Sequence, residues 1–111
     1  MHFRESSRKI HLSTSIRSTV EFAEVVKAIK EKYYSIDSKS SPLFLLSVLF
    51  EEVGELAEAV RKNKLEEIGE ELCDVLFMVI SLANYYNIEI ERKLVEKYLT
   101  GDPSSRWDLE R

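Results

Sequence analysis

Apolar residues recur at the three- and four-residue spacing of helices along most of the 111-residue sequence, and no stretch alternates as a strand would. This spacing predicts four helices, approximately at residues 18–34, 42–62, 63–86 and 87–101. We therefore expect an all-α fold, a four-helix bundle with a short fourth helix.

Local capping signals set the ends of these predicted helices. Ser18–Glu21 and Asn63–Glu66 both have the pattern of a capping box, and Ser41–Pro42 places a cap residue before a proline at the first helical position. The fourth helix is predicted to start at Asn87 and to end at Gly101.

The N-terminal residues differ in composition from the rest of the chain. Met1–Arg17 combine basic residues and serines with one acid, Glu5, and show no clear amphipathic helix. We expect residues 1–17 to form a flexible arm. Residues 18–111 should form one helical domain, since a chain of this length has the size of a single domain.

Composition argues against several classes of partner. The net charge of −4 disfavours binding to a nucleic-acid backbone, and no apolar run approaches the roughly 20 residues of a membrane span. Cys73 is the single cysteine, so no intrachain disulfide can form. This cysteine usage fits a reducing compartment, and we expect a cytoplasmic protein.

Two pairs of carboxylates stand out, Glu52/Glu55 in the second predicted helix and Glu71/Asp74 in the third, each with i, i+3 spacing. Residues three apart are neighbours on a helix surface. The polar segment centred on Asn63 predicts the turn of an antiparallel hairpin. Both pairs are equally far from that turn, so they should meet at one level. The sequence predicts a cluster of four carboxylates between two helices.

The helical positions of these carboxylates indicate a metal site. Glu52 and Glu71 fall inside the apolar stripes of their helices, and Asp74 falls at the margin. Burying a carboxylate is costly, and neighbouring carboxylates raise one another's pKa. A hard divalent cation relieves both effects, and oxygen ligands favour Mg²⁺ or Mn²⁺.

The segments EEVGE (Glu51–Glu55) and ELCD (Glu71–Asp74) together resemble the EExxE…ExxD signature of the MazG-type nucleotide pyrophosphohydrolases, and the likeness extends from about Val20 to Trp107. The resemblance implies an all-α bundle that uses magnesium to hydrolyse nucleoside triphosphates to monophosphates and pyrophosphate. It also implies the metal ligands, which are Glu52, Glu55, Glu71 and Asp74.

The resemblance further suggests how the substrate is held and attacked. The segment EKYLTGDPSSRW resembles the family's basic phosphate-binding segment, which implies that Lys97 and Arg106 bind phosphate. Cleavage between the α- and β-phosphates is implied as well. Glu55 or Glu67 would orient the attacking water, and the sequence does not choose between them.

Two other functions share these features. Phosphoribosyl-ATP pyrophosphohydrolase of histidine synthesis carries the same acidic motifs. A non-enzymatic helical oligomerisation module would use the carboxylates only to bind a structural cation. Release of pyrophosphate from a nucleoside triphosphate would separate all three interpretations.

Self-association is expected from the start of the second helix. Leu43–Phe50 is apolar on nearly every side, so the helix must be surrounded. Exposed, it would leave a larger apolar patch than soluble monomers usually carry. We expect a homodimer or homotetramer, and the resemblance implies the same.

Overall fold

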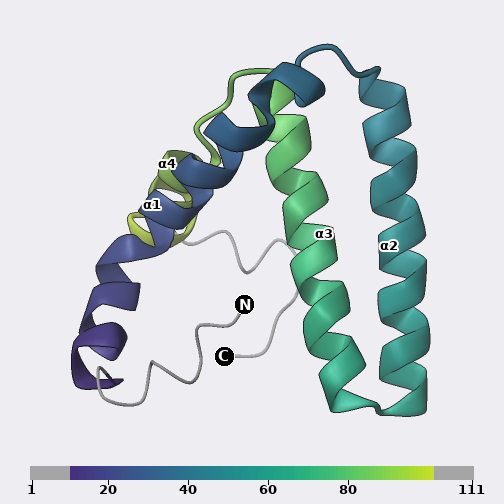
Figure 1. Cartoon of the computed structure of the whole chain (residues 1–111), viewed down its shortest axis with the longest axis horizontal. Helices are drawn as coiled ribbons and strands as arrows, with labels where there is room; N and C mark the ends of the chain where they lie inside the picture. Colours follow the sequence, from purple (N-terminus) through teal and green to yellow (C-terminus); the bar gives the residue numbers. More distant parts are fainter. Residues whose placement is uncertain (1–10, 102–111) are drawn as a thin grey trace.

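A computed structural model describes residues 11–101, with side chains from residue 22 onward, and every regular element in this part of the chain is helical. The elements are α1 (His11–Asp37), α2 (Pro42–Lys62), α3 (Leu65–Tyr85), α4 (Ile90–Leu94) and the π-helical turn η1 (Val95–Leu99) (Figure 1). The predicted all-α class is confirmed for these residues. None of the described helices is long and apolar enough to cross a membrane.

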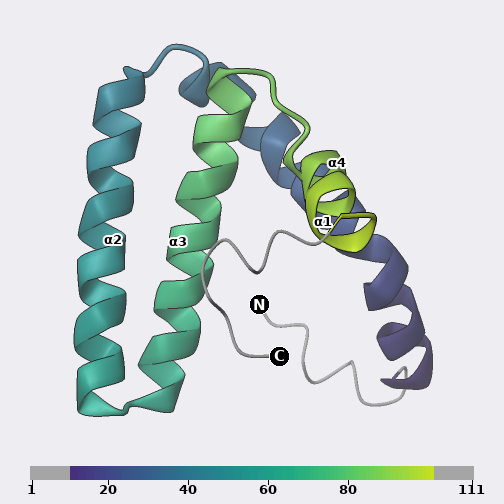
Figure 2. The same ribbon diagram turned by 180° about the vertical axis from the view of Figure 1, so that it is seen from behind.

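Helices α2 and α3 form the predicted antiparallel hairpin and lie side by side in both views (Figures 1 and 2). At the start of α2, the Ser41 hydroxyl accepts a hydrogen bond of 3.3 Å from the Phe44 backbone N–H, as the Ser41–Pro42 signal predicted. This cap satisfies one of the unpaired amide groups of the first turn.

The turn of the hairpin differs from the prediction. Asn63 adopts the left-handed conformation with φ of 57°, and its N–H donates to the Val60 carbonyl at 3.0 Å. The Lys64 N–H donates to the Ala59 carbonyl at 3.2 Å. Asn63 therefore ends α2 and does not cap α3, because asparagine tolerates the left-handed conformation that closes a helix. The capping box predicted at Asn63–Glu66 is wrong, and Lys64 precedes α3 without a side-chain cap.

Helix α1 is longer than predicted at both ends. It begins at His11 and not at Ser18, and it ends at Asp37 and not near Tyr34. The Ser18–Glu21 pattern lies inside the helix and does not start it. Residues 11–17, predicted as part of a flexible arm, are thus helical, and residues 1–10 lie outside the described part of the chain.

Helix α1 packs against the C-terminal half of α3. The rings of Tyr33 and Phe77 meet edge to face, with centroids 4.9 Å apart. The buried Asn84 amide donates to the Asp37 carboxylate at 2.9 Å and to the Lys30 carbonyl at 3.0 Å. These contacts fix the angle and register of α1 on α3.

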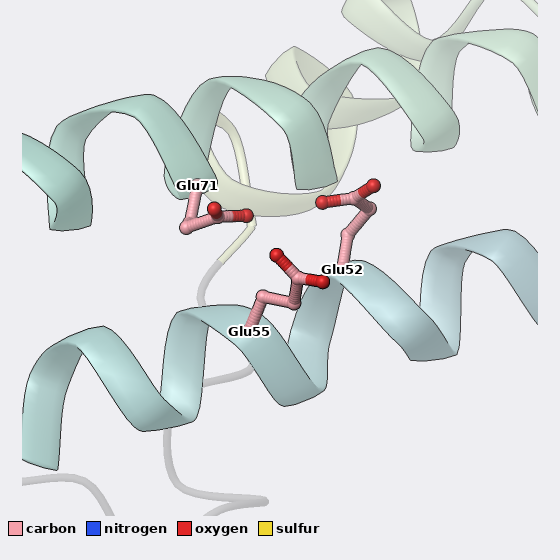
Figure 3. Close-up of side chains that lie close together, drawn as sticks. All are labelled: Glu52, Glu55 and Glu71. Atoms are coloured by element: carbon pink, nitrogen blue, oxygen red, sulfur yellow. The ribbon is translucent and has the colours of Figure 1, made fainter.

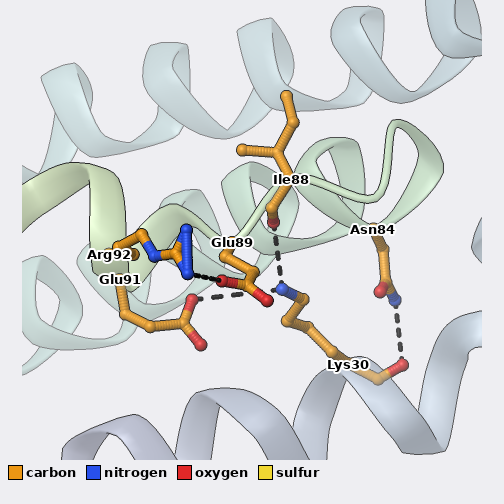
Figure 4. A network of polar contacts seen from close by, with 6 residues as sticks. All are labelled: Lys30, Asn84, Ile88, Glu89, Glu91 and Arg92. Carbon is orange, nitrogen blue, oxygen red and sulfur yellow. Dashed lines mark hydrogen bonds and ion pairs between the residues drawn. The ribbon is translucent and has the colours of Figure 1, made fainter.

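Lys30 also connects α1 to the segment that follows α3. Its ammonium group donates to the Ile88 carbonyl at 3.0 Å and lies 4.0 Å from the Glu91 carboxylate (Figure 4). The helix predicted from Asn87 starts later, since Asn87 has φ of 57° and belongs to the turn before α4. Asparagine again allows the left-handed turn.

The short C-terminal helix changes type along its length. After α4, the Thr100 N–H donates to the Val95 carbonyl at 3.1 Å, the i to i+5 bond of a π-helix. Gly101 follows directly, and a side chain there would come within 3.2 Å of the Lys97 carbonyl. The last described helical element ends at Leu99, two residues before the predicted stop at Gly101.

A single chain does not enclose a full bundle. Helix α1 contacts α3 far more than α2, and it diverges from the hairpin toward its own N-terminus (Figures 1 and 2). The radius of gyration is 16.2 Å, against about 13 Å for a compact chain of 100 residues. Many large apolar side chains stay exposed. Among the residues whose side chains the structure describes, the buried apolar ones are Val26, Leu45, Ala59, Met78, Ile80 and Ala83.

Candidate metal centre

The α2–α3 hairpin brings three carboxylates together. Glu52 and Glu55 extend from α2 toward Glu71 on α3 (Figure 3). One oxygen of each lies within 4.8 Å of the others. The register of the hairpin explains this meeting, because positions equally far from the turn at Asn63 lie at the same level. Two of these side chains are half-buried, and Glu55 is exposed.

Asp74, the fourth predicted member, lies outside this group of three. Its side chain is exposed, and it follows Glu71 by three residues, which turns it roughly 60° away around the helix. Its negative charge nevertheless raises the pKa of Glu71. Asp74 therefore lies at the edge of the cluster, close enough for its charge to act on Glu71.

Glu71 shows the electrostatic cost of this arrangement. Its Oε1 atom is buried and has no hydrogen-bond partner. Loss of solvent contact raises the pKa of Glu71 to about 7, with smaller contributions from the adjacent Glu52 carboxyl group and from the charges of Glu55 and Asp74. Each of these effects disfavours the ionised form. A free carboxylate here is poorly stabilised at neutral pH.

The contrast with Glu58, one turn further along α2, shows what the cluster lacks. Glu58 is exposed and pairs with Lys62 at 2.9 Å, and the hydrogen bond to this lysine lowers the pKa of Glu58. Every charge that shifts the pKa of Glu71 belongs to a carboxylate. A lysine thus neutralises Glu58 near the turn, whereas no cationic side chain shifts the pKa of Glu71 in the cluster.

A divalent cation fits this donor set. Ligand oxygens lie about 2.0–2.1 Å from Mg²⁺, so two oxygens on one ion are roughly 3–4 Å apart in an octahedral site. The oxygens of Glu52, Glu55 and Glu71 lie within 4.8 Å of one another, close to that spacing. An ion there would also provide the missing partner for the Glu71 Oε1 atom. Carboxylate oxygens without nitrogen or sulfur ligands favour Mg²⁺ or Mn²⁺.

The other predicted site residues lie outside the cluster. Glu67 is exposed, and its carboxylate is 3.9 Å from the Lys64 ammonium group near the turn. Lys97 is exposed on η1, with its ammonium group 5.7 Å from the centroid of the Tyr98 ring. Helix α4 and η1 lie on the α1 side of α3, away from α2 (Figures 1 and 2). Arg106 lies outside the described residues.

A separate cavity of about 230 Å³ lies between α1 and the end of α3, lined by Lys27, Lys30, Glu31, Tyr34, Asn84 and Glu91. Sequence reasoning did not find it, because its residues come from distant segments without a local motif. Asn84 and Glu71 are separated by 13 positions of one helix, which corresponds to roughly 20 Å. The cavity is therefore distinct from the carboxylate cluster.

Comparison with known proteins agrees with the acidic motifs. Residues 40–105 match the family model described as the MazG nucleotide pyrophosphohydrolase domain. The chain is also similar to the uncharacterized protein YpjD of Bacillus subtilis (strain 168), with 33% identity over 100 residues that cover 78% of this chain and 84% of the relative. No solved structure matches the chain. The family match spans the hairpin, α4 and η1, and it begins after α1.

Proposed function

Because the chain belongs to the MazG nucleotide pyrophosphohydrolase domain family, we propose that it is a Mg²⁺- or Mn²⁺-dependent enzyme that converts nucleoside triphosphates to nucleoside monophosphates and pyrophosphate. The observation that carries this proposal is the group of three carboxylates on α2 and α3, with a buried and unpartnered oxygen on Glu71. The family match alone supports nucleotide pyrophosphohydrolase activity, and the carboxylates supply the reason for a metal.

The proposed ligands differ in how close they lie to the centre of the cluster. Glu52, Glu55 and Glu71 would hold the ion directly, and Asp74 would join them from the edge of the cluster. A bound divalent cation supplies charge neutralisation for the phosphate oxygens. The half-buried positions of Glu52 and Glu71 would keep their carboxylates oriented while the substrate binds.

A carboxylate must also orient the attacking water and take its proton. Glu55 is the better candidate for this role, since its side chain is exposed and lies within the group of three carboxylates. Glu67, the second candidate, is engaged with Lys64 near the turn. In the proposed step, the water oxygen bonds to phosphorus, the bridging bond between the α- and β-phosphates breaks, and the water proton passes to the carboxylate. Pyrophosphate leaves with the electron pair of that bond.

Lys97 and Arg106 are the proposed phosphate contacts, on the basis of the basic segment in which they occur. For Lys97 to act in this way, η1 must approach the cluster, either in the same subunit or from a neighbouring one. The π-helical turn that carries Lys97 is a type of local structure often found at functional sites.

We also propose a homodimer or homotetramer in the cytoplasm. Support for association comes from large apolar side chains that remain exposed on α2 and α3. Support for the compartment comes from the single, exposed Cys73, which suits a reducing environment.

Product analysis tests the proposed reaction. Purified protein is incubated with Mg²⁺ and with dATP, dCTP, dGTP or dUTP in turn, without added pyrophosphatase, and the products are separated by chromatography. Phosphoribosyl-ATP is included as a fifth substrate. We expect nucleoside monophosphate and pyrophosphate. Nucleoside diphosphate and orthophosphate would refute the proposed bond, exclusive use of phosphoribosyl-ATP would indicate the histidine-synthesis reaction, and no hydrolysis would favour a non-catalytic module.

A further inference from the structure

The cavity between α1 and the end of α3 contains a hydrogen-bond acceptor that the protein does not use. The Oε1 atom of Glu91, on α4, is buried and has no hydrogen-bond partner among the described residues. The Lys30 ammonium group lies 4.0 Å from it, beyond hydrogen-bond distance, and donates to the Ile88 carbonyl at 3.0 Å (Figure 4). A buried carboxylate oxygen without a partner is costly, so this part of the cavity lacks a hydrogen-bond donor.

Asn84 presents a second acceptor to the same cavity. Its amide nitrogen donates to the Lys30 carbonyl and to the Asp37 carboxylate, which uses both amide hydrogens. Only the amide oxygen is left for a further partner. Two acceptors from different elements, α3 and α4, thus line one cavity, and an ammonium group with its three N–H donors matches them.

Lys27 and Glu31 add one charge of each sign from α1. Both residues are exposed, and neither forms an ion pair in the part of the chain that the structure describes. They are four positions apart with the lysine first, which is the less favourable order for an ion pair on a helix. Together with Lys30 and Glu91, they give the cavity two positive and two negative side chains, so its formal charge is zero.

The walls between these charges are apolar. The Tyr34 ring borders the cavity and is 45% exposed, and the methylene stems of the two lysines add aliphatic surface. The volume of about 230 Å³ is below the roughly 300–1,000 Å³ of pockets for drug-sized ligands. The cavity therefore suits a small molecule with a short carbon skeleton and polar groups at its ends.

We propose that this cavity binds the zwitterion of a free α-amino acid with an uncharged side chain. The ammonium group of the amino acid donates to Glu91 and Asn84, and its carboxylate accepts from Lys27. Its side chain lies against the Tyr34 ring. A simple amine would leave the lysine unmatched, and a simple carboxylate or phosphate would leave Glu91 without a donor. A charged side chain would add a charge that the cavity does not balance.

The site is separate from the carboxylate cluster, which lies roughly 20 Å away along α3. An amino acid bound there contacts α1, α3 and α4 together. Helix α4 continues directly into η1, which carries Lys97. Occupation of the cavity therefore fixes this C-terminal segment against α1.

Thermal melts of the metal-free protein, without nucleotide, test the proposal. L-alanine, L-leucine and L-glutamine represent uncharged side chains, and L-lysine and L-glutamate represent charged ones, each at millimolar concentration. At least one of the first three should raise the melting temperature, and by more than L-lysine or L-glutamate, because a ligand that binds only the folded chain stabilises it. The amino acid with the largest effect is then compared with the amine that lacks its carboxylate and the acid that lacks its amino group. Neither analogue should raise the melting temperature.

Calorimetric titration with the same amino acid tests the contacts. Glu91→Gln and Lys27→Gln should each weaken binding by roughly 10-fold or more, the loss expected for a hydrogen bond to a charged group. Glutamine has nearly the shape of Glu91, and Lys27 is exposed, so both variants should keep the helicity of wild type in circular dichroism. Glu89→Gln and Lys32→Gln are the controls, since both residues are exposed and do not line the cavity, and they should keep the wild-type affinity.

Several results would overturn the proposal. These are no rise in melting temperature with any of the three uncharged amino acids, an equal rise with one of the analogues, wild-type affinity in Glu91→Gln, or equal losses in the controls. Because metal and nucleotide are absent from these measurements, their outcome is independent of whether the chain hydrolyses nucleoside triphosphates.

Discussion

Glu52 and Glu71 face each other across the α2–α3 hairpin with carboxylate oxygens within 4.8 Å of one another, although they belong to different helices and both are acids. Two carboxylates this close repel each other when both are ionised. Full ionisation of the pair is therefore disfavoured in the absence of a cation. Proton and metal ion should compete for this position.

This competition gives stability a distinctive pH dependence. The pKa of Glu71 is raised from 4.5 to about 7 on folding, so the folded chain binds more protons than the unfolded chain between these values. The stabilising contribution of Glu71 is complete below pH 4.5 and is lost as the pH rises through about 7. Urea unfolding of metal-free protein at several pH values should show this decline. Glu71→Gln, which mimics the protonated acid, should flatten it. The exposed Glu66→Gln on the same helix is the control, and equal slopes for all three proteins would contradict the explanation.

Neutralising a metal ligand should abolish activity without unfolding the chain. Glu52→Gln and Asp74→Asn each remove one charge from a group of repelling carboxylates, so the metal-free variants should be as stable as wild type or slightly more so. Thermal melts with and without Mg²⁺ check this prediction, together with hydrolysis of a nucleoside triphosphate. If Mg²⁺ does not raise the melting temperature of wild type, and the variants melt several degrees lower without it, the carboxylates are structural.

Affinity for Mg²⁺ should rise with pH through about 7, because Glu71 must lose its proton to act as a ligand. Calorimetric titration at pH 6 and pH 8 measures the difference and the protons released. In Glu71→Gln, the remaining affinity should change much less between the two values. A pH-independent affinity in wild type would show that Glu71 is not a ligand.

The polar contact between α1 and α3 should make a large contribution to stability. Asn84→Ala removes hydrogen bonds to Asp37 and Lys30 and leaves a buried carboxylate without this partner. Such a loss costs about 1–3 kcal/mol. Urea unfolding measures it, with Ser47→Ala as the control, since Ser47 is exposed and its hydroxyl donates to the nearby Phe44 carbonyl. A loss no greater than that of Ser47→Ala would show that the contact contributes little.

Removal of the Lys97 charge should weaken substrate binding and leave metal binding intact. If Lys97 contacts phosphate, Lys97→Ala should raise KM by roughly 10-fold or more, the loss expected for a hydrogen bond to a charged group. Mg²⁺ affinity should stay at the wild-type value. Lys93→Ala, on the exposed surface of α4, serves as the control. A KM equal to that of the control would remove Lys97 from the site.

The hairpin and its carboxylates were predictable because they depend on local rules. The Ser41 cap, the i, i+3 spacing and the position of the turn together determine which acids meet, and Glu52, Glu55 and Glu71 do meet. The placement of Asp74 needed finer detail, since a residue at the margin of a stripe can point to either side.

Other features depended on competition between signals or on distant contacts. Asn63 has the sequence of an N-cap, but its tolerance of positive φ made it the end of the preceding helix. Asn84 and Asp37 are polar residues without a local motif, and only the packing of α1 on α3 makes them partners. The position of Lys97 on the α1 side follows from the turn at Asn87, which the sequence did not reveal.

The contacts of α1 connect α2 and α3 at the end of the hairpin opposite the turn. Helix α2 is joined to α3 by the turn at Asn63, and at its other end it is joined through residues 38–41 to α1, which is fastened to α3 by Phe77 and Asn84. The carboxylate cluster lies between the turn at Asn63 and the contacts of α1, so spreading the two helices would require breaking one of these connections. We therefore expect the repulsion between the carboxylates to be relieved by a proton or a cation and not by separation of the helices.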